Sequence, residues 1–327
     1  MKNSVIEIPN GIIAAVATPL TEEEQVDANG LRRLIDHIID GGVHGLLVLG
    51  TTGEAAALPP AQRQRTVELA VEYAAGRARV ICGLADVGTL SSIAFCRTAQ
   101  RAGADAVLTV APYFYRHDRE TAVQKHFQDV ADASPVPTYL YNTPAQTQVR
   151  LSLTMVERLA GHPNVVALKD TSGDFLFFQE LLAAYRNNPN FLLYQGVGYL
   201  LGASVMLGAA GAVAGLVIRV PRFFVKFYQA AKDGDIDSMF EMQRHLLEYK
   251  PLAQPGTDMG IPLIKAGLED LGLCSARCTR PFSPIEPVLR NRLRQFVQRC
   301  QKEELTQSRQ GADKEKSSRK DAKAQRK

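Results

Sequence analysis

Eight short apolar runs, spread evenly along the chain, constrain the fold most strongly. Each is nearly continuous in apolar residues, which is typical of parallel strands buried on both faces. A half-exposed strand would instead alternate apolar and polar residues. The pattern predicts eight parallel strands at residues 12–17, 45–49, 80–85, 106–111, 138–141, 165–168, 191–194 and 212–216.

Amphipathic stretches separate the apolar runs. In residues 27–40, five apolar side chains recur at helical spacing, and Gly41 and Gly42 then end the helix. Similar stretches occupy residues 89–102, 120–133, 153–160 and 176–186. Eight strand–helix units predict an α/β fold of the (β/α)8 TIM-barrel type. A doubly wound sheet is the rival, but no Gly-x-Gly-x-x-Gly motif follows the first strand.

The pattern becomes wholly helical after the eighth unit. We therefore divide the chain into barrel strands and helices (1–220), a final barrel helix with a C-terminal helical extension (221–302), and a charged tail (303–327). Helices are expected at residues 235–249, 261–272 and 284–302.

The formal charge of +4 is confined to the C-terminal end. Residues 302–327 hold nine basic and five acidic residues, so the rest of the chain is neutral. A neutral barrel gives no reason to expect a nucleic-acid surface. The tail has no large apolar residue after Leu305 and is expected to be disordered. It either aids solubility or, as the less favoured alternative, touches RNA or an anionic surface weakly.

Other sequence features exclude several protein classes. The chain has no apolar run of membrane-spanning length, and its N-terminus lacks a signal-peptide core, so we expect a cytoplasmic protein. Five cysteines argue against a disulfide framework. Cys274 and Cys278 have no second Cys or His pair nearby at ligand spacing, so we expect no metal site.

Polar residues and glycines gather where the predicted strands end, which is where TIM barrels carry their active sites. Lys169 directly follows the sixth apolar run. Burying an ammonium there is costly, so this lysine is expected to supply a neutral amine that attacks a ketone or aldehyde to form a Schiff base. The alternative is that Lys169 only pairs with Asp170 or Asp174.

Neighbouring strand ends carry hydroxyl groups that suit the same chemistry. Tyr141 ends the fifth strand, and its phenol can both donate and accept a proton. Thr51 and Thr52 can relay protons or bind a carboxylate, aided by backbone N–H groups of the turn from Gly50 to Gly53. One alternative is that residues 50–54 form only a loop and a helix cap, with Glu54 in the first turn of the following helix. The other is that Tyr141 is only an aromatic residue at the rim of the barrel.

The chain resembles the dihydrodipicolinate synthase/N-acetylneuraminate lyase family of Schiff-base (β/α)8 enzymes. The resemblance covers residues 8–300 and rests on five motifs in the family's order. These are GIIAAVATP (11–19), GTTGE (50–54), APYFY (111–115), YNTP (141–144) and LKDTSGD (168–174).

The resemblance implies roles for these residues. Lys169 would be the Schiff-base lysine, Tyr141 the proton-transferring tyrosine, and Thr52 a partner in the proton relay. The implied substrate site comprises Gly50, Thr51, Thr52, Gly53, Tyr115 and Gly196. It further implies a 2-oxo acid and an aldehyde as substrates, no cofactor, and a homo-oligomer, either a dimer or a tetramer built from dimers.

Three departures from the synthases of the family bear on the reaction. Gln146 stands where they carry an arginine for the semialdehyde carboxylate, although Arg150 lies close by. Phe114 replaces a relay tyrosine, and the residues after Gly196 lack the usual acids. We therefore favour an aldolase or lyase for 2-keto-3-deoxy sugar acids or 4-hydroxy-2-oxoglutarate. The alternatives are a 4-hydroxy-tetrahydrodipicolinate synthase, a keto-deoxy sugar acid dehydratase, and a non-catalytic scaffold with a basic tail.

Overall fold

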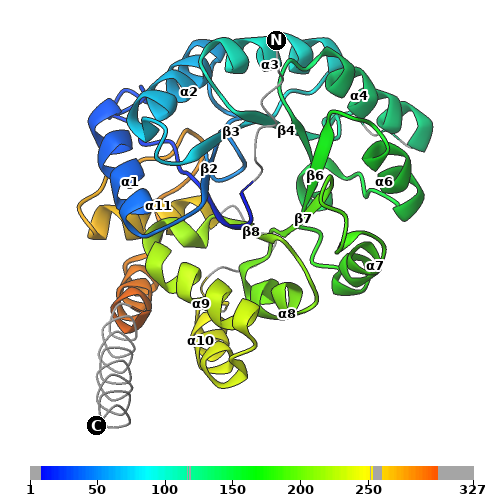
Figure 1. Cartoon of the computed structure of the whole chain (residues 1–327). Coiled ribbons are helices and arrows are strands. Elements are labelled where there is room, and N and C mark those ends of the chain that lie inside the picture. Colours follow the sequence, from blue (N-terminus) through cyan, green and yellow to red (C-terminus); the bar gives the residue numbers. More distant parts are fainter. Residues whose placement is uncertain (1–8, 116, 118, 251, 253–259, 301–327) are drawn as a thin grey trace, which may run out of the picture.

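The computed structural model describes residues 9–300, except 116, 118, 251 and 253–259. Its eight parallel strands close into a barrel in chain order (Figure 1). They are β1 (Gly11–Ala15), β2 (Gly45–Val48), β3 (Arg79–Leu84), β4 (Ala106–Val110), β5 (Thr138–Asn142), β6 (Val165–Asp170), β7 (Leu192–Gln195) and β8 (Gly211–Ala214). The predicted (β/α)8 barrel is confirmed, and pairing of β1 with β8 excludes an open doubly wound sheet.

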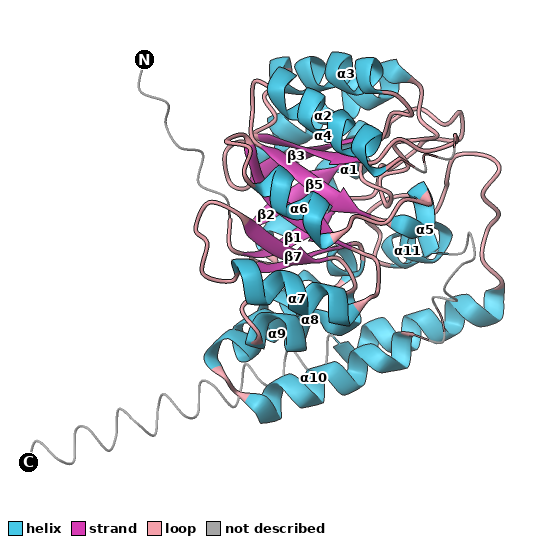
Figure 2. Cartoon of the chain, turned by 90° about the vertical axis from the view of Figure 1, so that its right-hand side faces the viewer, coloured by secondary structure: helices cyan, strands magenta, loops and turns pink. Residues whose placement is uncertain are grey.

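Helices surround the barrel (Figure 2). The barrel helices are α1 (Ala28–Asp40), α2 (Pro60–Ala74), α3 (Thr89–Arg101), α4 (Glu120–Ala133), α5 (Pro144–Thr147), α6 (Leu153–Ala160), α7 (Phe175–Tyr185), α8 (Leu201–Met206) and α9 (Pro221–Asp233). Short 3-10 turns occupy Gly198–Leu200 and Leu216–Arg219. The sequence pattern did not indicate helix α2, because its first residues, PAQRQRT, carry no apolar stripe. The side chains that this part of the helix buries are those of Arg63 and Thr66, which are polar.

The C-terminal extension contains α10 (Ile236–Tyr249), α11 (Gly260–Asp270) and a helix over residues 287–300. The last helix was expected from residue 284. It begins at Pro287 because proline suits the first helical position and disfavours a helical conformation in the residue before it. The predicted tail (303–327) lies outside the described residues. No helix in the described part of the chain is both long and apolar enough to cross a membrane.

Buried side chains form layers on both sides of the strands. Ile13 lies in the barrel interior with Leu47, Ile81 and Leu108, whereas Ile12 packs between the sheet and the helices. This alternation follows from the two-residue period of a strand. Both faces are therefore apolar, which explains the continuous apolar runs in the sequence.

Glycines allow the barrel to close. Gly11 of β1 pairs with Gly211 of β8. A Cβ atom on Gly211 would lie 1.8 Å from the Gly11 carbonyl oxygen, so no larger residue fits without moving a strand. The closed barrel brings all eight carboxyl-terminal strand ends to one face, where the site is built.

Candidate active site

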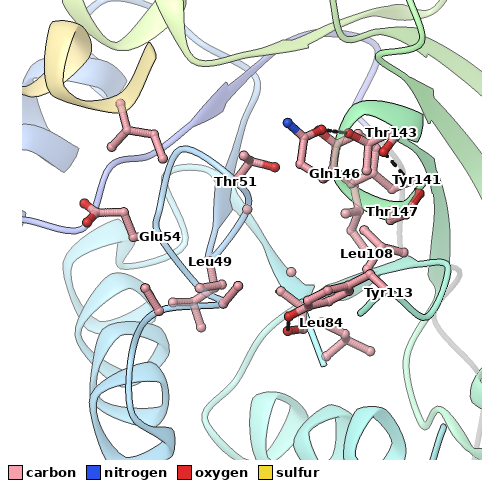
Figure 3. Close-up of a pocket in the computed structure, with 18 of the residues that line it drawn as sticks. Leu49, Thr51, Glu54, Leu84, Leu108, Tyr113, Tyr141, Thr143, Gln146 and Thr147 are labelled. Atoms are coloured by element: carbon pink, nitrogen blue, oxygen red, sulfur yellow. Dashed lines mark hydrogen bonds between the residues drawn. The ribbon is translucent and has the colours of Figure 1, made fainter. Parts of the chain in front are cut away.

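A cavity of about 300 Å³ opens at the carboxyl-terminal ends of the strands. Figure 3 shows Leu49, Thr51 and Glu54 on one side of it and Tyr141 and Gln146 on the other. Residues of β3 and β4, together with Ile261 and Phe282 from the C-terminal extension, complete the lining. The cavity therefore lies where a TIM barrel places its chemistry.

Tyr141 lines this cavity, and Lys169 lies directly beside Tyr141. They are register partners on the adjacent strands β6 and β5, and both are buried. The Lys169 Nζ atom lies 4.1 Å from the centroid of the Tyr141 ring. Strand β6 continues through Asp170, two residues beyond the predicted end, so ladder hydrogen bonds of the sheet hold Lys169 in place.

The phenol of Tyr141 is poised to exchange a proton near neutral pH. Burial alone would raise its pKa. The positive charge of Lys169 and hydrogen bonds with the hydroxyl groups of Thr171, Thr51 and Thr143 outweigh burial and lower the pKa to about 8. A tyrosine in this state can both donate and accept a proton at the lysine.

The two threonines of the GTTGE turn differ in position. Thr51 lines the cavity, and its hydroxyl is one of those that lower the pKa of Tyr141. Thr52, the predicted relay residue, faces the loop after β8: a Cβ atom on Gly215 would lie 2.7 Å from its Oγ1 atom. The role of Thr52 in the proton relay stays a prediction.

The glycines predicted for the substrate site shape its backbone. A Cβ atom on Gly53 would lie 2.9 Å from the Leu49 nitrogen, and the Gly53 N–H already donates to the Gly50 carbonyl oxygen. A Cβ atom on Gly196 would lie 1.9 Å from Thr171 Oγ1, so this glycine lets the loop after β7 pack on the end of β6. Gly50 lines the cavity, whereas Gly53 and Gly196 are not among its lining residues.

The aromatic residues after β4 also differ from expectation. Tyr115 is 69% exposed and packs edge-on against Phe114, which is itself 83% exposed. Tyr113 lines the cavity instead, and its hydroxyl donates to the Ala85 carbonyl oxygen at 2.8 Å. Tyr115 is thus not among the lining residues of this cavity, and its role in the substrate site stays a prediction. The chain turns at Phe114, whose φ of 76° directs neighbouring side chains apart.

The acidic residues after Lys169 have other partners. Asp170 accepts hydrogen bonds from Asn142 at 2.6 Å and from the Ser172 hydroxyl at 2.9 Å. Asp174 caps α7 and forms an ion pair with Arg150 at 3.0 Å. The alternative in which Lys169 merely pairs with one of these acids is therefore not supported. Arg150 is engaged by Asp174 and is not among the residues that line the cavity.

Sequence reasoning missed a buried ionic cluster behind the GTTGE turn. Glu54 forms an ion pair with Lys265 of α11, and both side chains are fully buried. Glu54 also accepts hydrogen bonds from Thr279 through its backbone N–H (2.6 Å) and its hydroxyl (2.8 Å), while Lys265 donates to the Arg277 carbonyl oxygen. The expected helix-cap role of Glu54 is wrong, because α2 begins six residues later at Pro60. The cluster ties the turn to the C-terminal extension.

The variant Lys265→Met is expected to lower the free energy of unfolding by about 3–5 kcal/mol, because it leaves the Glu54 carboxylate buried without its ionic partner. Urea denaturation with an unchanged m-value measures this loss. The double variant Glu54→Gln/Lys265→Met should recover much of it, because the glutamine amide is neutral and still accepts from Thr279. A loss below about 1 kcal/mol in the single variant would contradict the structural role.

The fold and the site together define an enzyme of the Schiff-base lyase and aldolase type. A buried lysine beside a tyrosine at the mouth of a (β/α)8 barrel is the arrangement that carbonyl chemistry through an imine requires. The chain belongs to the dihydrodipicolinate synthetase family, whose sequence profile matches residues 8–300.

Individual relatives agree with this assignment. A 4-hydroxy-tetrahydrodipicolinate synthase of Azoarcus sp. (strain BH72) is 33% identical over 291 residues, covering 86% of this chain and 95% of the relative. The dihydrodipicolinate synthase structure from Bacteroides thetaiotaomicron is 31% identical with a TM-score of 0.83, covering 89% of this chain and 98% of that one. YagE, an Escherichia coli K12 prophage protein solved in complex with pyruvate, is 28% identical with a TM-score of 0.84 and the same coverage.

Proposed function

We propose that the protein is a class I aldolase or lyase whose Lys169 forms a Schiff base with pyruvate or a longer 2-oxo acid. The observation that carries this proposal is the buried Lys169 amine, 4.1 Å from the ring centroid of Tyr141 at the strand ends. The structure of YagE with pyruvate, in a relative of the same fold, supports the substrate class.

The proposed cleavage begins at the keto carbon of the substrate. The Lys169 amine attacks C2, and the Tyr141 phenol supplies the proton with which the carbinolamine loses water, which leaves a phenolate. The phenolate then takes the proton of the C4 hydroxyl, and the iminium draws the electrons of the bond between C3 and C4, which breaks to release an aldehyde and leave an enamine. Protonation at C3 and hydrolysis release pyruvate and return the free amine. The iminium is itself the electron sink, so this cycle requires no metal or organic cofactor.

The substrate carboxylate needs hydrogen-bond donors near Lys169. We assign this role to the Thr51 hydroxyl, which lies in the cavity beside Tyr141. We keep Thr52 as the proposed relay partner of Tyr141, while Gly53 fits a tightly packed position of the turn. We also propose a homo-oligomer, either a dimer or a tetramer; the exposed rings of Phe114 and Tyr115 favour such an assembly.

A synthase is the second candidate, because curated relatives at about 30% identity carry that name. The lining of the cavity disfavours it. Gln146 cannot supply the positive charge that a semialdehyde carboxylate requires, and Arg150 is paired with Asp174.

The wild-type protein is therefore expected to condense pyruvate with aspartate semialdehyde poorly. The variant Gln146→Arg is expected to raise kcat/KM for that condensation at least about tenfold. The gain reflects one charge-assisted hydrogen bond to the semialdehyde carboxylate, which is worth about 1.5–3 kcal/mol. Steady-state assays of semialdehyde-dependent pyruvate consumption measure both rates. Efficient condensation by the wild type, unimproved in the variant, would establish the synthase instead.

A further inference from the structure

The cavity beside Lys169 indicates what kind of aldehyde the enzyme handles. Resting on the proposed Schiff-base function, we propose that the aldehyde that leaves or joins pyruvate is uncharged and mainly apolar, with an aliphatic chain or an aromatic ring. Three properties carry this inference: the apolar walls of the cavity, the hydrogen bonds that already engage most of its polar groups, and the absence of a cation among the lining residues that the structure describes.

The walls of the cavity are mostly hydrocarbon. Strands β3 and β4 contribute Leu84, Leu108 and Val110, and Phe282 of the C-terminal extension also lines it. On the side of the GTTGE turn lie Leu49 and three consecutive alanines at residues 55–57. A polyhydroxylated or charged chain placed here would lose its hydration without gaining partners. An apolar chain would gain free energy by leaving water.

Most polar groups of the lining are already bonded within the protein. The Tyr113 hydroxyl donates to the Ala85 carbonyl oxygen, and Glu54 is held by Lys265 and Thr279. The Thr143 hydroxyl donates to the Gln146 Oε1 atom, which leaves the Gln146 amide nitrogen as a neutral donor (Figure 3). One neutral donor suits a carbonyl or hydroxyl oxygen on an otherwise apolar molecule.

Positive charge is missing from the part of the lining that the structure describes. The nearby arginines are engaged elsewhere: Arg63 pairs with Asp86 at 3.0 Å, and Arg150 pairs with Asp174 at 3.0 Å. Arg63 also stacks on Phe95, with its guanidinium carbon 4.5 Å from the ring centroid. A second carboxylate, as in glyoxylate or aspartate semialdehyde, would therefore be buried without a counter-ion among these residues, which is strongly unfavourable. The inference thus departs from the two substrate types favoured from the sequence, because 4-hydroxy-2-oxoglutarate releases glyoxylate and a keto-deoxy sugar acid releases a polyhydroxylated aldehyde.

The size of the cavity fits this class of aldehyde. Its volume is about 300 Å³. An apolar cavity of about 150 Å³ is already large enough to hold benzene. Tyr141 lines the cavity with Lys169 beside its ring, so the pyruvyl group can occupy the end near Tyr141 while a ring or short chain fills the apolar part.

The reaction with such an aldehyde balances without any further reagent. In the direction of synthesis, C3 of the enamine attacks the aldehyde carbon, a carbon–carbon bond forms and the carbonyl π bond opens. The resulting alkoxide takes a proton from the Tyr141 phenol. Water then hydrolyses the iminium, which releases a 4-hydroxy-2-oxo acid and the Lys169 amine and returns the proton to the tyrosine.

The test is a competition among aldehydes on the full-length wild-type protein. Pyruvate is supplied together with benzaldehyde, butanal, glyoxylate or glyceraldehyde, and the aldol product is quantified by mass spectrometry. We expect kcat/KM for benzaldehyde or butanal to exceed that for glyoxylate and glyceraldehyde at least about 100-fold. Equal rates, or a preference for glyoxylate or glyceraldehyde, would overturn the inference.

Two variants and one independent readout sharpen the result. Gln146→Leu should keep the preference for apolar aldehydes, and Arg150→Gln should leave all rates unchanged because its guanidinium is paired outside the cavity. A loss of glyoxylate turnover in Arg150→Gln would show that this arginine binds a carboxylate and would refute the inference.

Borohydride trapping of pyruvate is scored separately from the aldehyde preference. An adduct together with a preference for charged aldehydes refutes only the aldehyde class, whereas the absence of an adduct refutes the Schiff-base function as well.

Discussion

Replacing Lys169 with methionine is expected to lower kcat/KM for pyruvate-forming cleavage by at least about 10⁴-fold, a loss typical of removing a catalytic nucleophile. Methionine fills similar volume but has no amine, so neither the imine nor the electron sink can form. The buried position of Lys169 between β5 and β7 suits an apolar replacement, so the barrel should remain folded. Continuous assay of pyruvate release measures the loss.

The matched control is Lys169→Arg. It keeps a positive charge near the Tyr141 ring, but a guanidinium stays protonated and does not attack a ketone. The activity of Lys169→Arg should fall as far as that of Lys169→Met. At least one of these two variants should keep the circular dichroism spectrum and the unfolding midpoint of the wild type, which shows that the loss of activity is not a loss of folding. Retention of a tenth of the wild-type rate by either folded variant would show that the lysine acts only through charge or packing.

Replacing Tyr141 with phenylalanine is expected to reduce kcat by about 10²–10⁴-fold, the usual range for losing a general acid–base group. The ring stays in the β5 strand beside Lys169, so the loss isolates the hydroxyl. Tyr139→Phe is the matched control. Tyr139 lies two residues earlier on the same strand, also in the barrel interior, where its ring stacks on Tyr194 rather than beside Lys169.

The pH dependence distinguishes proton transfer from simple packing. Because the pKa of Tyr141 is about 8, the phenolate becomes abundant as pH rises through 8 and can accept the proton of the Lys169 ammonium. The rate of imine formation should therefore rise through about pH 8 in wild type, and this inflection should be absent in Tyr141→Phe. An unchanged inflection in the variant would assign the titration to another group.

The architecture and the proximity of Lys169 to Tyr141 could be predicted from sequence because they depend on local regularities. Apolar runs buried on both faces identify parallel strands, and strand ends in a barrel meet on one face. Lys169 and Tyr141 each stand at such an end, so the register between β5 and β6 brings them together. Neither the identification of the strands nor the placement of residues at their ends requires knowledge of a loop conformation.

The differences at the site arise in loops or between distant segments. The pair of Glu54 with Lys265 joins residues more than 200 positions apart, and a lysine within an apolar helix gives no sequence signal of its partner. Adjacent residues in a turn point to different sides, so sequence alone cannot decide between Thr51 and Thr52. Likewise, only the backbone at Phe114 determines that Tyr113 reaches the cavity while Tyr115 does not.

The most direct test of the Schiff-base account is reductive trapping. The full-length protein is incubated with pyruvate and sodium borohydride, digested, and mapped by peptide mass spectrometry. We predict a reduced pyruvyl adduct on Lys169 that is absent when pyruvate is omitted and absent in Lys169→Met. Folded wild-type protein without any adduct, or with an adduct on a different lysine, would contradict the assignment of Lys169 as the catalytic amine.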